Sequence, residues 1–334
     1  MKNILLIRLK SIGDILFLLP AVHRLRENFP GAKITFFTSR ENAPLLEGFQ
    51  EVDEVITLDR ARFQSGNPKV ILSGAFSLFR RLRRGKFSLV VDFQGYGETA
   101  WLARLSGAPQ RWGNVYGPGR RWAYTRGVTR NDRIHHVDWY LSFLQQCGLP
   151  PGKIVNEFVL PEAALGEAQK FFVAHNLDAA KPVLFIQPFT SSPSKNWPLD
   201  RYLAVARHGR EHGLQILFGG GPAERAALEP VRQSGFPVSA GVPMLVTGGL
   251  MKLSSLVLGG DTGALHLAVA MGKRVVMIGD SVAPGKTHPF QHADWTITPP
   301  AGQILSCLET GPVIQACSHA FNELSRTGLK LAPW

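Results

Sequence analysis

A strand–turn–helix–strand pattern in residues 253–278 constrains the fold of this chain more than any other feature. The apolar runs 253–258 and 274–278 predict two buried strands, and small residues between them predict a helix that ends at Gly272. The turn that opens the helix reads Gly260-Asp261-Thr262-Gly263. This is the βαβ pattern of an α/β protein.

The same turn predicts an anion site. The first amides of a helix lack internal partners, Thr262 can cap the helix, and Gly263 lets a phosphate approach the backbone. Asp261 would follow a strand, where ligands of open α/β sheets bind, and His266 lies one turn into the helix. Because a carboxylate repels an anion, Asp261 is better suited to neutral hydroxyls, and phosphate plus polyol suggests a nucleotide sugar. The alternative is a tight connection with a packed histidine.

Strands and helices alternate along both halves of the chain, which predicts two domains, 1–155 and 156–334, that face a ligand cleft. In the first half we expect strands at 3–9, 33–38, 55–58 and 87–92, helices at 14–28, 70–84 and 135–147, and a loop at 113–129. In the second half we expect further strands at 182–187 and 214–218, and helices at 199–212 and 311–326.

Charge and cysteine content narrow the function classes. Residues 1–150 carry 22 Lys and Arg against 12 Asp and Glu, a net charge of +10. This charge indicates an acidic partner, such as nucleic acid, an anionic membrane or an anionic substrate, or else simply a surface made soluble by cations. The three cysteines have no metal-ligand spacing and predict a reducing, cytosolic environment. The apolar stretch 15–22 is too short to span a membrane and predicts a buried helix.

The motif Lys10-Ser11-Ile12-Gly13-Asp14 follows the first strand. It lacks the three spaced glycines of a dinucleotide fingerprint, which argues against a nucleotide-dependent oxidoreductase. Asp14 is either a helix cap or a general base that removes a proton from an acceptor hydroxyl.

Two further loops that follow strands carry polar groups. Thr190, Ser191 and Lys195 suit a phosphate cradle, although a solvated turn would look the same, and the loop lacks the glycines of a Walker motif. Glu224, just after a triple glycine, suits ribose hydroxyls or, equally, the first turn of a helix.

Two basic runs lie in the first half, at residues 80–86 and 120–133, the second interleaved with aromatic residues. A solvated face is the simplest explanation. A nucleic-acid groove would look similar, but no helix-turn-helix, RRM or zinc-finger motif is present. A phosphorylated, acidic glycolipid fits these runs better.

Four of these segments, in order, resemble glycosyltransferase family 9, the ADP-heptose:lipopolysaccharide heptosyltransferases. They are Ser11-Ile12-Gly13-Asp14 with Leu19-Pro20-Ala21, Val90-Val91-Asp92-Phe93-Gln94-Gly95, Thr190 to Pro198, and Asp261-Thr262-Gly263 with His266. The resemblance implies a GT-B fold, in which two Rossmann-like doubly wound domains face a cleft. It also implies inverting, metal-independent transfer of a heptose or related sugar from an ADP-sugar to a lipopolysaccharide inner-core, lipid A–Kdo acceptor.

The resemblance assigns roles to individual residues. Asp14 would be the catalytic base, and the last helix would pack back on the N-terminal, acceptor-binding domain. The C-terminal domain would bind the donor, and the donor-binding residues would be Thr190, Ser191, Lys195, Glu224, Asp261, Thr262, Gly263, His266 and Lys286. The acceptor-binding residues would be Lys10, Ser11, Arg60, Arg80, Arg81 and Arg120.

No cofactor or metal is expected, because the nucleotide sugar is a co-substrate. The expected partners are that sugar, an anionic glycolipid and the inner face of the plasma membrane, where a cytoplasmic enzyme would bind peripherally, and not nucleic acid. One departure is that Gly279-Asp280-Ser281 replaces the family's Gly-Pro-Thr-like turn. Lys286 would therefore replace a donor contact, or the donor is another nucleotide sugar for a different surface glycan.

Overall fold

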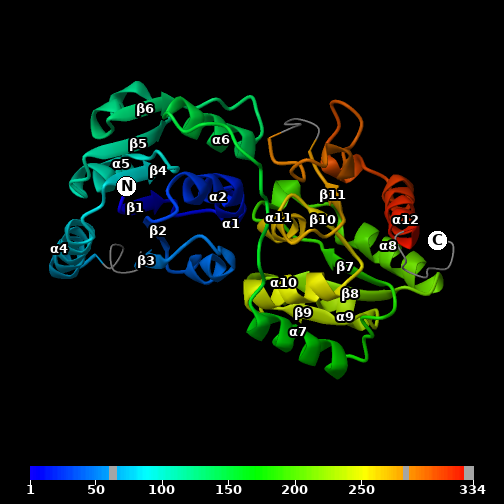
Figure 1. The fold of residues 1–334 in the computed structure, drawn as a ribbon. Coiled ribbons are helices and arrows are strands. Elements are labelled where there is room, and N and C mark those ends of the chain that lie inside the picture. The colour runs from blue at the N-terminus through cyan, green and yellow to red at the C-terminus, as the bar shows by residue number, and fades with distance from the viewer. Residues whose placement is uncertain (60–65, 281–285, 327–334) are drawn as a thin grey trace. The chain divides into compact units, whose positions relative to one another are not determined.

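The structure, a computed structural model, describes residues 1–59, 66–280 and 286–326. The chain divides into two compact units, Met1–Asn156 and Glu157–Trp334. Each unit contains a six-stranded sheet in which all paired strands run parallel (Figure 1). The expectation of two doubly wound α/β sheets is therefore confirmed.

The first sheet has the strand order β3-β2-β1-β4-β5-β6. The chain winds outward from β1 to β3 and then returns to place β4 on the other side of β1, as in Rossmann folds, so the topological switch point lies between β1 and β4. The strands are β1 (Asn3–Ile7), β2 (Lys33–Ser39), β3 (Glu54–Leu58), β4 (Leu89–Asp92), β5 (Gln110–Val115) and β6 (Arg126–Thr129). The helices are α1 (Ile12–Leu16), α2 (Leu19–Asn28), α4 (Pro68–Arg84), α5 (Gly97–Leu105) and α6 (His136–Gln146), with 3₁₀ turns η1 (Ala43–Gly48) and η2 (Pro118–Ala123).

Two expectations for the first unit were wrong in detail. The single helix expected at 14–28 is two helices, because Pro20 lacks an amide hydrogen and stands in the first turn of α2, where that hydrogen is not needed. The loop expected at 113–129 contains part of β5, η2 and β6. Its polar composition was misleading, because Asn114 is buried and its amide donates to the Phe93 carbonyl at 3.1 Å.

The apolar stretch 15–22 falls in α1 and α2, and all its side chains are buried, as expected. Among the helices of the described residues, none combines the length and apolar composition needed to cross a bilayer.

The second sheet repeats the same topology, with the order β12-β11-β10-β7-β8-β9, so its switch point lies between β7 and β10. The strands are β7 (Val183–Gln187), β8 (Gln215–Gly220), β9 (Val238–Ala240), β10 (Leu256–Gly260), β11 (Val275–Ile278) and β12 (Thr296–Ile297). The helices are α7 (Glu162–Ala174), α8 (Leu199–Glu211), α9 (Glu229–Gln233), α10 (Met244–Leu253), α11 (Gly263–Ala270) and α12 (Thr310–Arg326). Four 3₁₀ turns complete the described part of this unit: η3 (Pro193–Lys195), η4 (Pro222–Glu224), η5 (Ala293–Trp295) and η6 (Leu305–Cys307).

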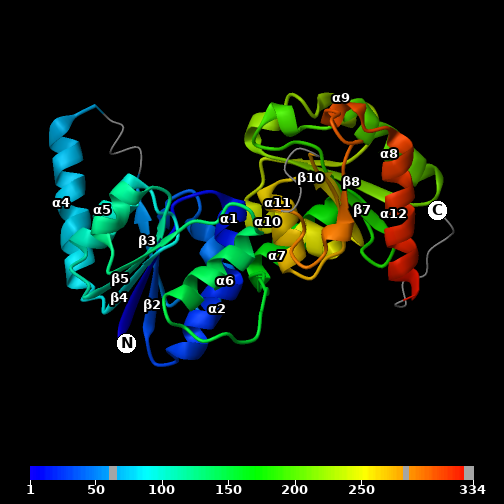
Figure 2. The same cartoon turned by 90° about the horizontal axis from the view of Figure 1, so that it is seen from above.

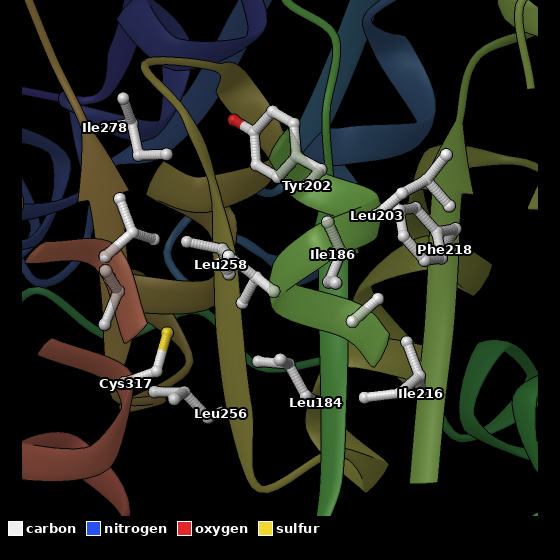
Figure 3. Close-up of a cluster of buried hydrophobic side chains, with 14 of the residues drawn as sticks. Leu184, Ile186, Tyr202, Leu203, Ile216, Phe218, Leu256, Leu258, Ile278 and Cys317 are labelled. Carbon is white, nitrogen blue, oxygen red and sulfur yellow. The ribbon is translucent and has the colours of Figure 1, made fainter. Parts of the chain in front are cut away.

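Alternate side chains of the central strands form the core of the second unit (Figure 3). Leu184 of β7 is paired with Leu256 of β10, and both pack in one buried cluster with Tyr202 of α8 and Cys317 of α12. The last helix, α12, thus packs against α8 and strands β10 to β12 of its own unit. Its expected packing on the first domain stays a prediction.

Candidate functional site

The donor-type residues of the second unit follow the two strands that flank its switch point. Thr190 and Lys195 follow β7, and Asp261 follows β10, which is paired with β7. The carboxyl ends of neighbouring parallel strands meet at one edge of the sheet, where open α/β sheets bind ligands. The topology therefore brings together two loops that lie far apart in sequence.

Asp261 is the centre of a polar cluster at this edge. Its Oδ1 lies 2.9 Å from His266 Nε2, and its Oδ2 lies 3.3 Å from Lys195 Nζ. Thr287, a residue that the sequence reasoning missed, donates its hydroxyl to the same Oδ2 at 2.9 Å. Burial acts to raise the pKa of Asp261, but the His266 hydrogen bond and the Lys195 charge outweigh it and lower that pKa to about 2. Asp261 is therefore ionised at neutral pH.

The Thr190 loop is held close to this cluster by its own hydrogen bonds. The Thr190 amide donates to Asn196 Oδ1 and its hydroxyl donates to the Ser192 carbonyl, both at 2.8 Å. A Cβ on Gly260 would lie 2.6 Å from Thr190 Cγ2, so the approach of this loop to β10 requires glycine there. Ser191 is exposed beside Thr190 and is accessible to a ligand.

The amino terminus of α11 has the cap that the sequence suggested. Thr262 precedes the helix, and its hydroxyl oxygen accepts a hydrogen bond from the Leu265 amide at 3.4 Å. Gly263 is the first helical residue, so its amide lies among those that lack helical partners. The turn can accept an anion next to the Lys195 ammonium.

A pocket of about 400 Å³ opens beside Asp261 in the second unit. Its lining combines the polar cluster with the ends of β11 and β12: Lys195, Asp261, Met277, Ile278, Gly279, Asp280, Thr287, His288, Ala293, Thr296, Thr298 and Leu305. Lys286 directly precedes the lining residue Thr287, and the residues just before it, 281–285, lie outside the described part of the chain. The mixture of polar and apolar walls is typical of small-molecule sites.

Glu224 lies on the loop after β8, the strand next to β7. Its carboxylate accepts a hydrogen bond from the Gly221 amide at the start of η4, which is the first-turn role that the sequence left open. A contact of Glu224 with ribose stays a prediction.

In the first unit, Asp14 follows β1 at the switch point. Its Oδ2 accepts hydrogen bonds from the Ser11 amide at 3.1 Å and the Ser11 hydroxyl at 2.9 Å. The same oxygen lies 2.7 Å from Arg8 Nη2. Ser11 is thus the N-cap of α1, and Asp14, the third residue of the helix, completes a capping box with it and also forms an ion pair with a buried guanidinium.

Arg8 and His136 are site residues that the sequence reasoning missed. Arg8 is buried at the end of β1 and donates to the Phe93 carbonyl at 3.0 Å, and an arginine within an otherwise apolar strand was the available signal. His136 Nδ1 lies 3.6 Å from Asp14 Oδ1. Burial lowers the pKa of His136 to about 4, so this imidazole is neutral at neutral pH.

The charge of Arg8 therefore dominates the environment of Asp14. Burial acts to raise the pKa of Asp14, but Arg8 and the Ser11 amide outweigh burial and hold that pKa below the ordinary aspartate value. The carboxylate is ionised at neutral pH, as a proton acceptor must be.

The loop around Asp14 is positioned from the neighbouring strand β4. Gln94, which follows β4, accepts a hydrogen bond from the Leu9 amide at 3.0 Å, and a longer one from Lys10. The Lys10 and Ser11 side chains are at this edge, with Lys10 exposed. Arg120 joins the same edge, because its Nη1 donates to the Gly95 carbonyl at 2.9 Å.

The other expected acceptor residues are not brought to this edge. Arg80 and Arg81 lie in the last turns of α4, just before β4 begins, and Asn3 at the start of β1 donates to the Gly85 carbonyl at 2.9 Å. The end of α4 is therefore at the amino ends of the strands, opposite the edge that holds Asp14. Arg60 lies outside the described residues.

Within the described residues, no group of three or more His, Cys, Asp or Glu side chains is placed to hold a metal ion.

Comparisons with known proteins identify the family and the fold of this chain. The model of the family described as glycosyltransferase family 9 (heptosyltransferase) matches residues 75–310. The lipopolysaccharide core heptosyltransferase OpsX of Haemophilus influenzae is 23% identical over 308 residues, which cover 88% of this chain and 83% of that protein.

Two solved structures extend the likeness over nearly the whole chain. A family 9 glycosyltransferase from Veillonella parvula has a TM-score of 0.87 and 22% identity, covering 96% of this chain and 97% of its own. The E. coli heptosyltransferase WaaC with ADP-2-deoxy-2-fluoro heptose has a TM-score of 0.75 and 20% identity, and the match covers 95% of this chain and 99% of WaaC. The shared fold confirms the GT-B class expected from the sequence.

Proposed function

Because the chain belongs to glycosyltransferase family 9 and is a glycosyltransferase, we propose that it transfers a heptose from ADP-heptose to a lipopolysaccharide inner-core, lipid A–Kdo acceptor. The observation that carries the proposal is the cluster of Asp261, Lys195 and the capped α11 terminus at the switch point of the second sheet. An anion site and an ionised carboxylate stand side by side there, as a sugar diphosphate requires.

The donor would bind with its diphosphate on Lys195 and on the amides at Thr262 and Gly263. Thr190 and Ser191 would add hydroxyl donors, and Lys286 is a further candidate cation. Asp261 would accept hydrogen bonds from the sugar hydroxyls, with His266 and Thr287 holding its carboxylate in place. The solved structure of WaaC with an ADP-heptose analogue supports this choice of donor.

Asp14 would act as the general base. As the acceptor oxygen attacks the anomeric carbon, its proton passes to Asp14, and the bond from that carbon to the diphosphate breaks with its electron pair leaving on ADP. Lys195 and the α11 amides would stabilise the charge that develops on ADP. A single displacement of this kind inverts the anomeric configuration, and it requires no metal when fixed positive groups stabilise the leaving group.

The acceptor is proposed to be an anionic glycolipid at the inner face of the plasma membrane, reached by a cytoplasmic, peripheral enzyme. The net charge of +10 in residues 1–150 supports an acidic partner. Lys10, Ser11 and Arg120 stand at the Asp14 edge and could contact the reacting sugar. Arg80 and Arg81, at the opposite edge, would meet more distant anionic groups.

The decisive experiment offers a panel of nucleotide sugars with a lipid A–Kdo acceptor and identifies products by mass spectrometry. We expect a heptose added only from ADP-heptose, with release of ADP and an anomeric configuration opposite to that of the donor. Transfer of another sugar in preference would redirect the proposal to a different surface glycan. NAD(P)H binding with no transfer would favour an oxidoreductase instead.

A second measurement repeats the assay in EDTA. Activity should persist, because Lys195 and the helix amides supply the positive charge. Strict dependence on added magnesium or manganese would overturn the metal-independent mechanism.

A further inference from the structure

Helix α4 presents an apolar stripe that plays no part in the protein core. Leu72, Phe76 and Phe79 are 69%, 60% and 38% exposed. Their spacing of four and three residues places them on one face of the helix. Both views show α4 at the outer edge of the first unit, beside α5 (Figures 1 and 2).

A different face of α4 attaches the helix to the protein. Gly74 and Leu82 are buried, and Leu78 packs against the core cluster of the first unit, again at helical spacing. The exposed stripe is therefore a second apolar face, and the fold does not require it. A contiguous apolar stripe left in water indicates a surface that another apolar phase covers.

The charged residues of α4 indicate what covers the apolar stripe. The helix contains no Asp or Glu, and Lys69, Arg80, Arg83 and Arg84 are exposed on or beside the stripe. Arg80 lies over the Phe76 ring at 5.6 Å and Arg83 over the Phe79 ring at 5.8 Å. Guanidinium groups next to exposed rings match the boundary between lipid headgroups and acyl chains.

We propose that α4 lies flat on an anionic bilayer, with Leu72, Phe76 and Phe79 inserted below the headgroups and the arginines on lipid phosphates. A nucleic-acid duplex would complement the arginines but offers no apolar surface to the Leu72, Phe76 and Phe79 stripe, and an apolar protein partner would leave the arginines unpaired. The inference rests on the proposed function, since a glycolipid acceptor gives the enzyme a reason to bind a membrane. Beyond that function, the inference names the segment that binds the membrane and the way in which it binds.

The test is sedimentation with vesicles that contain no glycolipid acceptor. The stripe variant carries Leu72→Gln, Phe76→Gln and Phe79→Gln, since glutamine keeps helix propensity while removing the apolar groups. On phosphatidylglycerol–phosphatidylcholine vesicles we expect its partitioning to fall about tenfold or more below wild type. Wild-type binding should also weaken with salt and be lost on pure phosphatidylcholine.

A matched control removes equally exposed apolar groups from other parts of the chain. Ile154→Gln, Val173→Gln and Ile304→Gln alter side chains that are 40%, 77% and 70% exposed, and binding should stay within about twofold of wild type. If the stripe variant does not fold by circular dichroism, Leu72→Gln alone, at the most exposed position, is compared with Val173→Gln alone.

Insertion is measured with an environment-sensitive fluorophore on Phe76→Cys. The exposed Cys307 is first replaced by serine, while Cys147 and Cys317 are buried. Emission should shift to the blue on anionic vesicles, and a probe on Val173→Cys should not shift. Unchanged vesicle binding by the stripe variant, wild-type binding to neutral vesicles as strong as to anionic ones, or no shift at position 76 would each overturn the inference.

Activity on a deacylated, water-soluble acceptor separates this inference from the proposed function. The stripe variant should transfer sugar to that acceptor at the wild-type rate. If neither protein transfers any sugar but the stripe variant still loses vesicle binding, the proposed function fails and the membrane helix stands. If the stripe variant instead changes from dimer to monomer in solution, a second copy covers the stripe and the inference is wrong.

Discussion

At the scale of the residue, Asp14 combines helix-capping contacts with the ionised state that a general base needs, so the two interpretations of the sequence are compatible. Its Oδ2 caps α1 through Ser11 and pairs with Arg8, while Oδ1 faces the neutral His136. A cap that is also ionised and held in place suits a general base, because the carboxylate need not reorient when the acceptor arrives.

We therefore expect Asp14→Asn to lower kcat by ~10²–10⁴ while ADP affinity stays near wild type, since an amide can still accept the Ser11 hydrogen bonds but cannot take the proton. Steady-state kinetics and calorimetric ADP titration measure the two quantities. Asp200→Asn, at a first-turn acidic residue of α8, is the control and should leave kcat unchanged. Full activity of Asp14→Asn would reduce Asp14 to a helix cap.

Lys195 is the residue on which donor affinity should depend most. It is half exposed and lies 3.3 Å from Asp261, so it is placed to contact an incoming diphosphate. Lys195→Ala should weaken ADP binding by roughly 1.5–3 kcal/mol, the scale of a hydrogen bond to a charged group. Lys170→Ala, which removes an exposed lysine from α7, should leave ADP affinity intact; equal losses in both variants would argue against a specific phosphate contact.

At the scale of the element, we expect the amino terminus of α11 to contribute both to stability and to donor binding. The Thr262 hydroxyl satisfies the Leu265 amide, so Thr262→Val should cost about 1 kcal/mol of unfolding free energy and also weaken ADP binding. Thr262→Ser keeps the hydroxyl, so this variant should retain most of the unfolding free energy and most of the ADP affinity. Chemical denaturation and ADP titration of the two variants test this, and a valine variant with wild-type stability would show that the cap contributes little.

Helix α4 should govern the encounter with the acceptor and not with the donor. Changing Arg80, Arg81, Arg83 and Arg84 together to glutamine should raise the KM for a lipid-embedded acceptor and weaken vesicle binding, because each basic group near an anionic surface contributes about 1 kcal/mol. The wild-type KM should climb with salt as the charges are screened. ADP affinity should not change.

The control for this helix changes Lys170 and Lys181, two exposed lysines of the second unit, to glutamine. Their loss should leave the acceptor KM unchanged. If the α4 variant instead loses ADP affinity and keeps acceptor binding, the basic half of the chain has been assigned to the wrong substrate.

At the scale of the whole molecule, each unit places at its candidate site a partly buried carboxylate whose pKa is lowered by its partners: Asp14 in the first and Asp261 in the second. A carboxyl whose pKa is lower in the folded than in the unfolded state stabilises the fold above the unfolded value and loses that stabilisation as pH falls through the folded one. Acid should therefore weaken both units.

We expect the free energy of unfolding to be insensitive to these groups from neutral pH to about pH 5, and to fall between about pH 4 and pH 2. Asp261, with a pKa of about 2, should account for roughly 2 kcal/mol of that loss. Denaturant titrations at several pH values provide the measurement. Asp261→Asn should be less stable at neutral pH and show a smaller acid loss; an acid loss equal to wild type would mean that Asp261 is not the group that titrates.

Most strands and the positions of the loops that carry polar site residues could be read from the sequence alone, whereas helices α5, α7 and α10 were not predicted. Parallel strands buried on both faces must be continuous apolar runs, and the loops after them must begin with turn residues, so the Asp14, Thr190 and Asp261 loops were recognisable. A polar strand such as β5 is not recognisable in this way, because buried Asn114 satisfies its hydrogen bonds through Phe93 and Trp139, partners that the local sequence does not reveal.

Only the tertiary structure decided which groups meet. Lys195 pairs with Asp261 because β7 and β10 are neighbours in the sheet, and strand order follows from packing, not from distance along the chain. Likewise, the arginines of α4 are separated from Asp14 because α4 leads into the amino end of β4. Local sequence determines whether a segment forms a helix or a strand, but the packing of segments that lie far apart in the chain determines which residues it contacts. The sequence predicts a helix that contains Leu72, Phe76 and Phe79, but only the fold shows that these apolar side chains are exposed.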